Sequence, residues 1–330
     1  MTVSLALRNY PRISVKRRRQ IQQLAKKFGY RPNPLVSALM AGRKNSITYR
    51  MSSTLACIDG CDNVADLEAL PWWNWHVQGI KERAQELGFT VDSFHARDFN
   101  FNDACLNSVL KARGIRGIVF LQASNLDKDV KLEWEYFACV KMLNWYPKAR
   151  LHYVRGDDAA GLQLALEKLT CYGYTRIGLA LPSSIDYILI LGVFQNYQTQ
   201  IHSTGRIPFF SSNYFPGENY RTHGDLHRWY CRHRPDVIIA YGFDYHEELV
   251  PFGIRVPEDV AWVKVGIYQY DRKTAGIGGT NSQAVGRAAV DVIAQQLFTN
   301  SYGLPGNHMT VMISTNEQWV DGVTVPKKRR

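Results

Sequence analysis

Short apolar runs alternate with longer amphipathic segments from Thr54 to the end of the chain. The apolar runs predict buried strands at 53–59, 89–95, 115–121, 137–143, 176–181, 235–241 and 259–266. Apolar residues at helical spacing predict helices at 74–88, 103–114, 162–173, around 186–202, from Asp244 onward and at 282–297. This succession predicts an α/β fold with parallel, doubly wound sheets covered by helices on both faces, and roughly 270 residues fit two lobes better than one.

The first fifty residues follow a different pattern, because they predict helices alone. The segment 14–28 begins with Ser14, whose hydroxyl can cap a helix, and Gly29 and Pro32 end it. One apolar stripe runs along this helix and predicts a buried face: Ile21, Leu24, Ala25 and Phe28. Shorter helices are predicted before it, from Thr2 to Leu7, and after it, from Pro34 to Met40.

Charge separates these fifty residues from the rest of the chain. They carry twelve Lys and Arg and no Asp or Glu, whereas the remainder carries 28 basic and 29 acidic residues. The formal net charge of +11 is therefore confined to the head. Four of the cations, Lys16 to Arg19, lie in the first turn of the predicted helix, where they oppose the helix dipole. A cationic arm on a near-neutral body is typical of a protein that binds a polyanion such as DNA, although a solvated charged tail is the alternative.

The motifs of the head and body together resemble one family. "TVSLALRN", "RIS" and "LAKKFGYRPNPLVSALMAGRK" resemble the DNA-binding head of lactose-repressor-like (LacI/GalR) transcription regulators. "CYGYTRIGLAL", "PDVIIAY", "GIRVPEDVAWVKVG" and "NSQAVGRAAVDVIAQQL" follow in the family's order, and "EQWVDGVTV" resembles the ending of one subgroup. The resemblance implies a helix-turn-helix head at 1–33, a hinge helix and linker at 34–50, and a two-lobed, periplasmic-binding-protein-like effector and dimerisation domain at 51–330. It also implies three crossings between the lobes, near Val154, Gly276 and Thr310.

The resemblance assigns roles within the head. Met1 to Leu7 corresponds to the recognition helix, Ser14 to Phe28 to the third helix, and Pro34 to Met40 to the hinge helix. Leu39 falls at the position that wedges between base pairs in the minor groove, and packing between two hinge helices is its alternative role. The residues implied to contact DNA are Thr2, Val3, Ser4, Leu5, Arg8, Asn9, Arg12, Ser14, Lys16, Arg17, Tyr30, Asn33, Ser37, Ala38 and Leu39.

The family's first head helix and its turn have no counterpart in this sequence. Two explanations stay open. Either translation starts upstream of Met1, or the head is truncated and its arm binds DNA through charge alone, without sequence specificity.

Candidate effector-binding residues lie where strands end, because open α/β sheets bind ligands at the carboxyl ends of their strands. The sequence "LPWWNWH" places Trp72, Trp73 and Trp75 just before a helix, where they can stack on a sugar or pack in a core or an interface. The resemblance adds five polar or aromatic positions: Asn144, Asp186, Tyr220, Phe243 and Tyr268. Many sugar-binding members carry an Arg in the helix after "RIGLAL" and an Asn-Asp pair after "PDVIIA", and this chain has neither. The effector is therefore unusual, or the cleft binds none.

Other chemistry finds no support in the sequence. The chain has no G-x-S-x-G, Walker or H-E-x-x-H motif, so we predict no enzyme activity, no cofactor and no metal. The six cysteines form no CxxC pair and are interpreted as reduced core thiols, and His227 and Cys231 are expected on one helix face without a carboxylate to orient the imidazole. "GIGGT" at 276–280 is interpreted as an interlobe turn, and the closing "KKRR" as a frayed terminus.

The sequence therefore predicts a cytoplasmic, nucleoid-associated homodimeric regulator that binds an operator in double-stranded DNA and a small-molecule effector. The family resemblance implies that this effector is related to a sugar. No membrane segment is predicted. The alternatives are a truncated regulator or a small-molecule binding protein without sequence-specific DNA binding.

Overall fold

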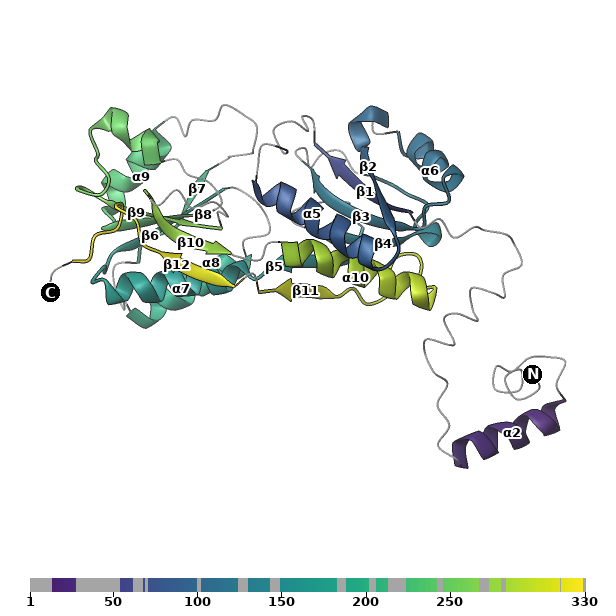
Figure 1. Cartoon of the computed structure of the whole chain (residues 1–330). Coiled ribbons are helices and arrows are strands. Elements are labelled where there is room, and N and C mark those ends of the chain that lie inside the picture. Colours follow the sequence, from purple (N-terminus) through teal and green to yellow (C-terminus); the bar gives the residue numbers. More distant parts are fainter. Residues whose placement is uncertain are drawn as a thin grey trace. The chain divides into compact units, whose positions relative to one another are not determined.

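The chain divides into two compact units, residues 1–50 and 51–330. The computed structural model describes residues 14–27, 54–61, 68, 71–99, 102–123, 130–142, 149–182, 188–201, 206–212, 224–241, 246–266, 273–279, 283–314 and 316–328. In the first unit the described element is helix α2 (Val15–Lys27). The second unit contains two six-stranded sheets (Figure 1).

The first sheet has the strand order β11-β5-β4-β3-β1-β2, and every pairing in it is parallel. Its strands are β1 (Thr54–Gly60), β2 (Thr90–His95), β3 (Gly117–Ala123), β4 (Ala138–Met142), β5 (His152–Gly156) and β11 (Thr310–Ile313). Helices α5 (Pro71–Glu86) and α10 (Gln283–Thr299) pack on one face, and α6 (Asp103–Ala112) packs on the other. Two short 3-10 helices, η1 (Ala96–Phe99) and η2 (Trp134–Tyr136), complete this lobe.

The second sheet has the order β12-β10-β9-β8-β6-β7. Its strands are β6 (Ile177–Pro182), β7 (Phe210–Ser212), β8 (Val237–Tyr241), β9 (Ala261–Val265), β10 (Ala275–Gly279) and β12 (Glu317–Val320). Only the β10–β12 pairing is antiparallel. Helices α7 (Asp158–Cys171) and α8 (Ile188–Ile201) cover one face, while α9 (Asp225–His233) and the 3-10 helix η4 (His246–Phe252) cover the other. The prediction of two parallel-sheet lobes with helices on both faces is confirmed.

The chain passes between the two sheets three times. The passages run from β5 to α7 at 156–158, from β10 to α10 at 279–283, and from β11 to β12 at 313–317. Each lies a few residues beyond the predicted position. The first and third passages are joined, because the backbone N–H of Asp157 donates to the carbonyl of Ile313 at 2.9 Å. The Asp157 side chain also accepts from the N–H of Ala160 and so caps α7.

Several local predictions were wrong. "GIGGT" was expected to be a turn, but 275–279 form strand β10, where a Cβ on Gly276 would lie 2.6 Å from the carbonyl oxygen of Lys264. Glycine is therefore needed for this strand to approach β9. The helix expected from Asp244 is the 3-10 helix η4 over 246–252, and it contains Pro251, whose missing N–H cannot serve an α-helix.

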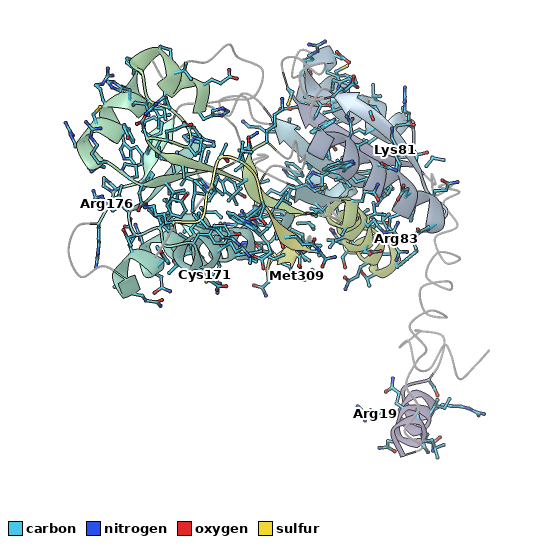
Figure 2. The ribbon with its side chains drawn as sticks, turned by 60° about the vertical axis from the view of Figure 1, so that its left-hand side comes forward. Arg19, Lys81, Arg83, Cys171, Arg176 and Met309 are labelled. Carbon is cyan, nitrogen blue, oxygen red and sulfur yellow. The ribbon has the colours of Figure 1, made fainter. Side chains whose placement is uncertain are left out.

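Helices α5 and α10 lie side by side at unusually short range (Figure 1). A Cβ on Gly79 would lie 2.1 Å from the carbonyl oxygen of Gln283, and a Cβ on Gly286 would lie 2.1 Å from that of His76. The two helix backbones are therefore in contact at both glycines. An ion pair also joins the two helices, because Arg83 on α5 lies 2.7 Å from Asp291 on α10. Arg83 also pairs with Glu86 of its own helix at 2.7 Å; Figure 2 labels Arg83.

The C-terminal residues to 328 are docked, so the prediction of a frayed terminus is wrong for this part of it. Asp321 accepts from the Tyr172 hydroxyl at 2.7 Å and from the Trp319 indole at 2.8 Å. The Lys328 ammonium lies 2.6 Å from Asp236. The "WVDG" segment therefore binds the C-terminal tail to α7, a structural role that explains its aromatic and acidic residues.

The cysteine interpretation is half right. All six cysteines are free; Cys57, Cys61 and Cys139 are buried, but Cys105, Cys171 and Cys231 are exposed on helices (Figure 2 labels Cys171). Sequence spacing does not reveal which face of a short helix a cysteine occupies when the flanking residues are polar. Among the described residues, no helix is both long enough and apolar enough to cross a membrane.

Candidate DNA-binding helix and effector cleft

Helix α2 carries a dense positive charge over its first turns. The first turn contains no acidic residue, and Lys16, Arg17 and Arg19 are exposed; Figure 2 labels Arg19 on this helix. Ser14 directly precedes the helix, at the position predicted for its cap. Because cations at a helix N-terminus oppose the helix dipole, this charge does not stabilise α2. Exposed cations held along one rigid helix are suited to contact phosphates.

The apolar stripe of α2 is only partly buried. Ile21 and Ala25 are half-buried, but the side chain of Leu24 is 53% exposed, which contradicts the prediction of one buried face. Helical spacing places apolar residues on a common face, but it does not establish what covers that face. Phe28 lies outside the described residues.

Most of the predicted DNA contacts lie outside the described residues and stay predictions. They are Thr2, Val3, Ser4, Leu5, Arg8, Asn9, Arg12, Tyr30, Asn33, Ser37, Ala38 and Leu39. The predicted recognition and hinge helices lie outside them as well.

The three tryptophans lie within α5, not ahead of it as predicted, because the helix begins at Pro71. Trp73 is 5% exposed and belongs to the same hydrophobic core as Leu55, Cys57 and Cys61. This is the core-packing alternative. Trp75 is half-buried, and the side chain of Trp72 lies outside the described part of the structure.

The other five predicted effector residues follow the carboxyl ends of strands along the sequence but lie outside the described residues: Asn144, Asp186, Tyr220, Phe243 and Tyr268. They come after β4, β6, β7, β8 and β9 respectively. Their positions relative to one another stay a prediction. The described strand ends, however, hold two charged clusters that the sequence reasoning missed.

The first cluster lies at the carboxyl ends of β1 and β2. The Asp59 carboxylate is 4% exposed and lies 2.6 Å from His95 Nδ1, while its other oxygen accepts from the N–H of Cys61 at 3.3 Å. Burial raises the pKa of Asp59, and His95 opposes that rise. The carboxylate therefore fixes the orientation of an imidazole whose side chain is 30% exposed.

The second cluster lies at the first passage between the lobes. Tyr153 and Arg155 project from one face of β5, since Val154 between them packs in the core against α10. The Arg155 guanidinium donates to Asp158, the first residue of α7, at 3.1 Å. The hydroxyl of Tyr241, the last residue of β8, also donates to Asp158. One strand from each sheet and helix α7 thus meet at one carboxylate.

Electrostatics within this second cluster are unfavourable for Asp158. Burial raises the pKa of Asp158, nearby Glu317 adds to that rise, and Arg155 and Tyr241 oppose it. Two cations on β5 and its neighbour β4 lie near the Tyr153 ring, with the Arg155 guanidinium 5.8 Å and the Lys141 ammonium 5.5 Å from its centroid. The signal for this site in the sequence was an arginine near the end of the short strand "HYVRG".

The histidine and cysteine of α9 lie on one helix face, as predicted. The Cys231 sulfur lies 3.2 Å from His227 Nε2, and the His227 ring stacks on Phe252 with centroids 4.0 Å apart. An aromatic ring, not a carboxylate, orients this imidazole. No group of three potential metal-binding side chains occurs within the described ranges.

Comparisons with known proteins rest on structure. No family model matches the sequence. No curated protein matches it either. Among solved structures, the transcriptional regulator CelR in complex with cellobiose is similar at a TM-score of 0.60 and 17% identity, covering 97% of this chain and 94% of that one.

Two further structures extend this likeness. The lac repressor dimer bound to operator and the anti-inducer ONPF is similar at a TM-score of 0.55 and 17% identity, covering 98% of this chain and 94% of that one. A LacI-family regulator from Enterococcus faecium with bound ribose is similar at 0.56 and 14% identity, covering 84% and 100%. All three are named as transcription regulators or repressors. The chain thus has the two-lobed fold of the LacI-family transcription regulators.

Proposed function

We propose that this protein is a LacI-type transcription regulator that binds operator DNA through its N-terminal head and a small molecule in its interlobe cleft. The likeness to the operator-bound lac repressor covers 98% of this chain. The single observation that carries the proposal is the joining of this fold to a head that holds the entire net charge, with twelve cations and no acid in fifty residues.

The effector proposal rests on the strand ends. Solved relatives of the same fold hold cellobiose and ribose, and open α/β sheets bind ligands at the carboxyl ends of their strands. In this chain those ends carry Asp59, His95, Arg155 and Tyr241. Hydroxyl-rich molecules are bound by such charged and hydroxyl side chains, so a carbohydrate-related effector is proposed.

Homodimerisation, cytoplasmic location and association with the nucleoid belong to the same proposal. A dimer would present two heads to a palindromic operator. Effector binding would then shift the population between two lobe arrangements and so change the pairing of the heads.

The test is the salt dependence of DNA binding by the full chain. The triple variant K16A/R17A/R19A removes three exposed cations from α2. If each contacts a phosphate, the slope of log affinity against log salt decreases by about 2.7, at 0.9 per contact. The matched control K131A/R150A/R206A removes three exposed cations from the body. We expect the control to keep the wild-type slope.

Equal effects of the two triple variants would contradict the proposed role of α2. A wild-type chain that is folded and dimeric but binds no duplex would overturn the regulator proposal and leave a small-molecule binding protein.

A further inference from the structure

A buried cation at the first passage between the lobes requires an explanation. Arg155 is 9% exposed, and within the described ranges it is the one lysine or arginine among the buried residues. Burying a charge is costly unless it is paired. Its partner is Asp158, at 3.1 Å. Removal of the pair from water is seldom a net gain in stability, so stability alone is a weak reason for its presence.

The location of the pair indicates a ligand site. Arg155 is the last residue but one of β5, and Tyr241 is the last residue of β8, so both lie at carboxyl strand ends, where this architecture binds ligands. Both side chains of the ion pair retain some access to solvent, 11% for Arg155 and 23% for Asp158. By contrast, α8 (Ile188–Ile201) contains no lysine or arginine that could contact a ligand.

Asp158 accepts a hydrogen bond from the Arg155 guanidinium, as the anionic group of a ligand would. A planar guanidinium matches carboxylate and phosphate groups through two parallel N–H donors. Asp158 takes one such donor, and the Tyr241 hydroxyl supplies it with a second bond from the other sheet. Burial and Glu317 both disfavour the charged form of Asp158. Arg155 is thus held by a carboxylate whose charged form is disfavoured, so an incoming anion that stays ionised would compete with Asp158 for the guanidinium.

We propose that Arg155 is the specificity-determining cation of the cleft, and that the effector is an anionic sugar, a sugar acid or sugar phosphate, whose carboxylate or phosphate replaces Asp158 on Arg155 and Tyr241. This inference rests on the proposed function of the cleft. A neutral sugar offers no charge to exchange for Asp158, so we expect it to bind this ion pair less tightly than an anionic sugar does. Lys141, which pairs with Tyr153 in the sheet and lies 5.5 Å from the centroid of its ring, adds a second positive charge to the same face.

The experiment is titration calorimetry of the full chain with three probes of one skeleton: glucose, glucuronate and glucose 6-phosphate. We expect at least tenfold tighter binding of one anionic probe than of glucose, and the two anionic arms distinguish carboxylate from phosphate. Inorganic phosphate alone serves as a fourth probe, to separate recognition of the anion from recognition of the sugar.

Variants then test the residue. R155M should lower the affinity for the anionic probe by about tenfold to a hundredfold, the range for a charged hydrogen-bonded pair. The affinity of R155K should lie between those of wild type and R155M, because lysine keeps the charge but lacks the two parallel donors of arginine. D158N should increase the affinity for the anionic probe, since it removes the carboxylate charge that competes with the probe for Arg155. The double variant R155M/D158N leaves no unpaired buried charge and shows the same loss if R155M alone fails to fold. The control R150M removes an exposed arginine and should change nothing.

Three results would overturn the proposal: tighter binding of glucose than of both anions, equal weakening of glucose and the anions by R155M/D158N, or no binding of any probe. DNA binding in the absence of sugar is measured on the same samples. If all variants still bind DNA but the sugar results are negative, the inference about Arg155 is wrong and the regulator proposal stands. If the wild type does not bind DNA, the regulator proposal is wrong.

Discussion

The buried histidine of α5 should make the stability of this protein depend on pH. His76 is 2% exposed, and burial lowers its pKa from 6.5 to about 4. The unfolded chain therefore binds a proton at this site more tightly than the folded chain does. Stability contributed by the neutral ring is complete above pH 6.5 and is lost as the pH falls toward 4.

The size of the effect follows from the shift in pKa. A difference of about 2.5 pKa units corresponds to about 3 kcal/mol, and about 2 kcal/mol of it is lost by pH 5. Urea unfolding at pH 7.5 and pH 5 measures this loss. Carboxylates also destabilise the fold in acid, so the loss is compared with that of His76→Gln, which should be smaller by about 2 kcal/mol. His308→Gln, an exposed histidine, serves as the control. The reasoning is refuted if wild type and His76→Gln lose the same free energy of unfolding.

Three further predictions concern the packing of the second unit. Gly286→Ala places a methyl group 2.1 Å from the His76 carbonyl oxygen and should cost about 1–3 kcal/mol; a urea midpoint equal to that of wild type would contradict the close contact of α5 and α10. Asp321→Ala removes the acceptor of two hydrogen bonds and should cost about 1 kcal/mol, because the carboxylate is exposed; calorimetry should find a lower Tm. Ellman's reagent should modify three thiols in the native protein and six after denaturation, because Cys57 and the other core thiols are buried and burial raises the pKa of Cys57 to about 12; a native count of six would contradict the described core.

The alternating pattern of the sequence was sufficient to predict the two-lobed fold, because long buried strands carry the clearest signal. β8, "VIIAY", is buried at every residue. β7 has three residues, and β11 and β12 have four each with half-exposed side chains. Such short strands form through pairing with neighbours rather than through their own propensity. Strand β10, "AGIGG", was missed because glycines have little strand propensity of their own.

The candidate site was harder to predict because side-chain direction is set by packing. Nothing in "LPWWNWH" distinguishes Trp73, which is buried in the core, from Trp75, which is half-buried. Likewise, no role was predicted for Arg155, because its segment was interpreted as a passage between lobes. Arg155 pairs with Asp158, which also accepts from the Tyr241 hydroxyl, and this arrangement depends on two sheets meeting, which no local pattern encodes.

The central claim is that this chain recognises a specific DNA sequence through its basic head. The most direct measurement is the selection of bound duplexes from a randomised library by the full chain at near-physiological salt, followed by sequencing. The account predicts enrichment of a two-fold symmetric site that binds at least a thousandfold more tightly than unrelated duplex, the low end for specific binding. A bound pool with no common motif, or equal affinity for selected and unrelated duplexes, would contradict it.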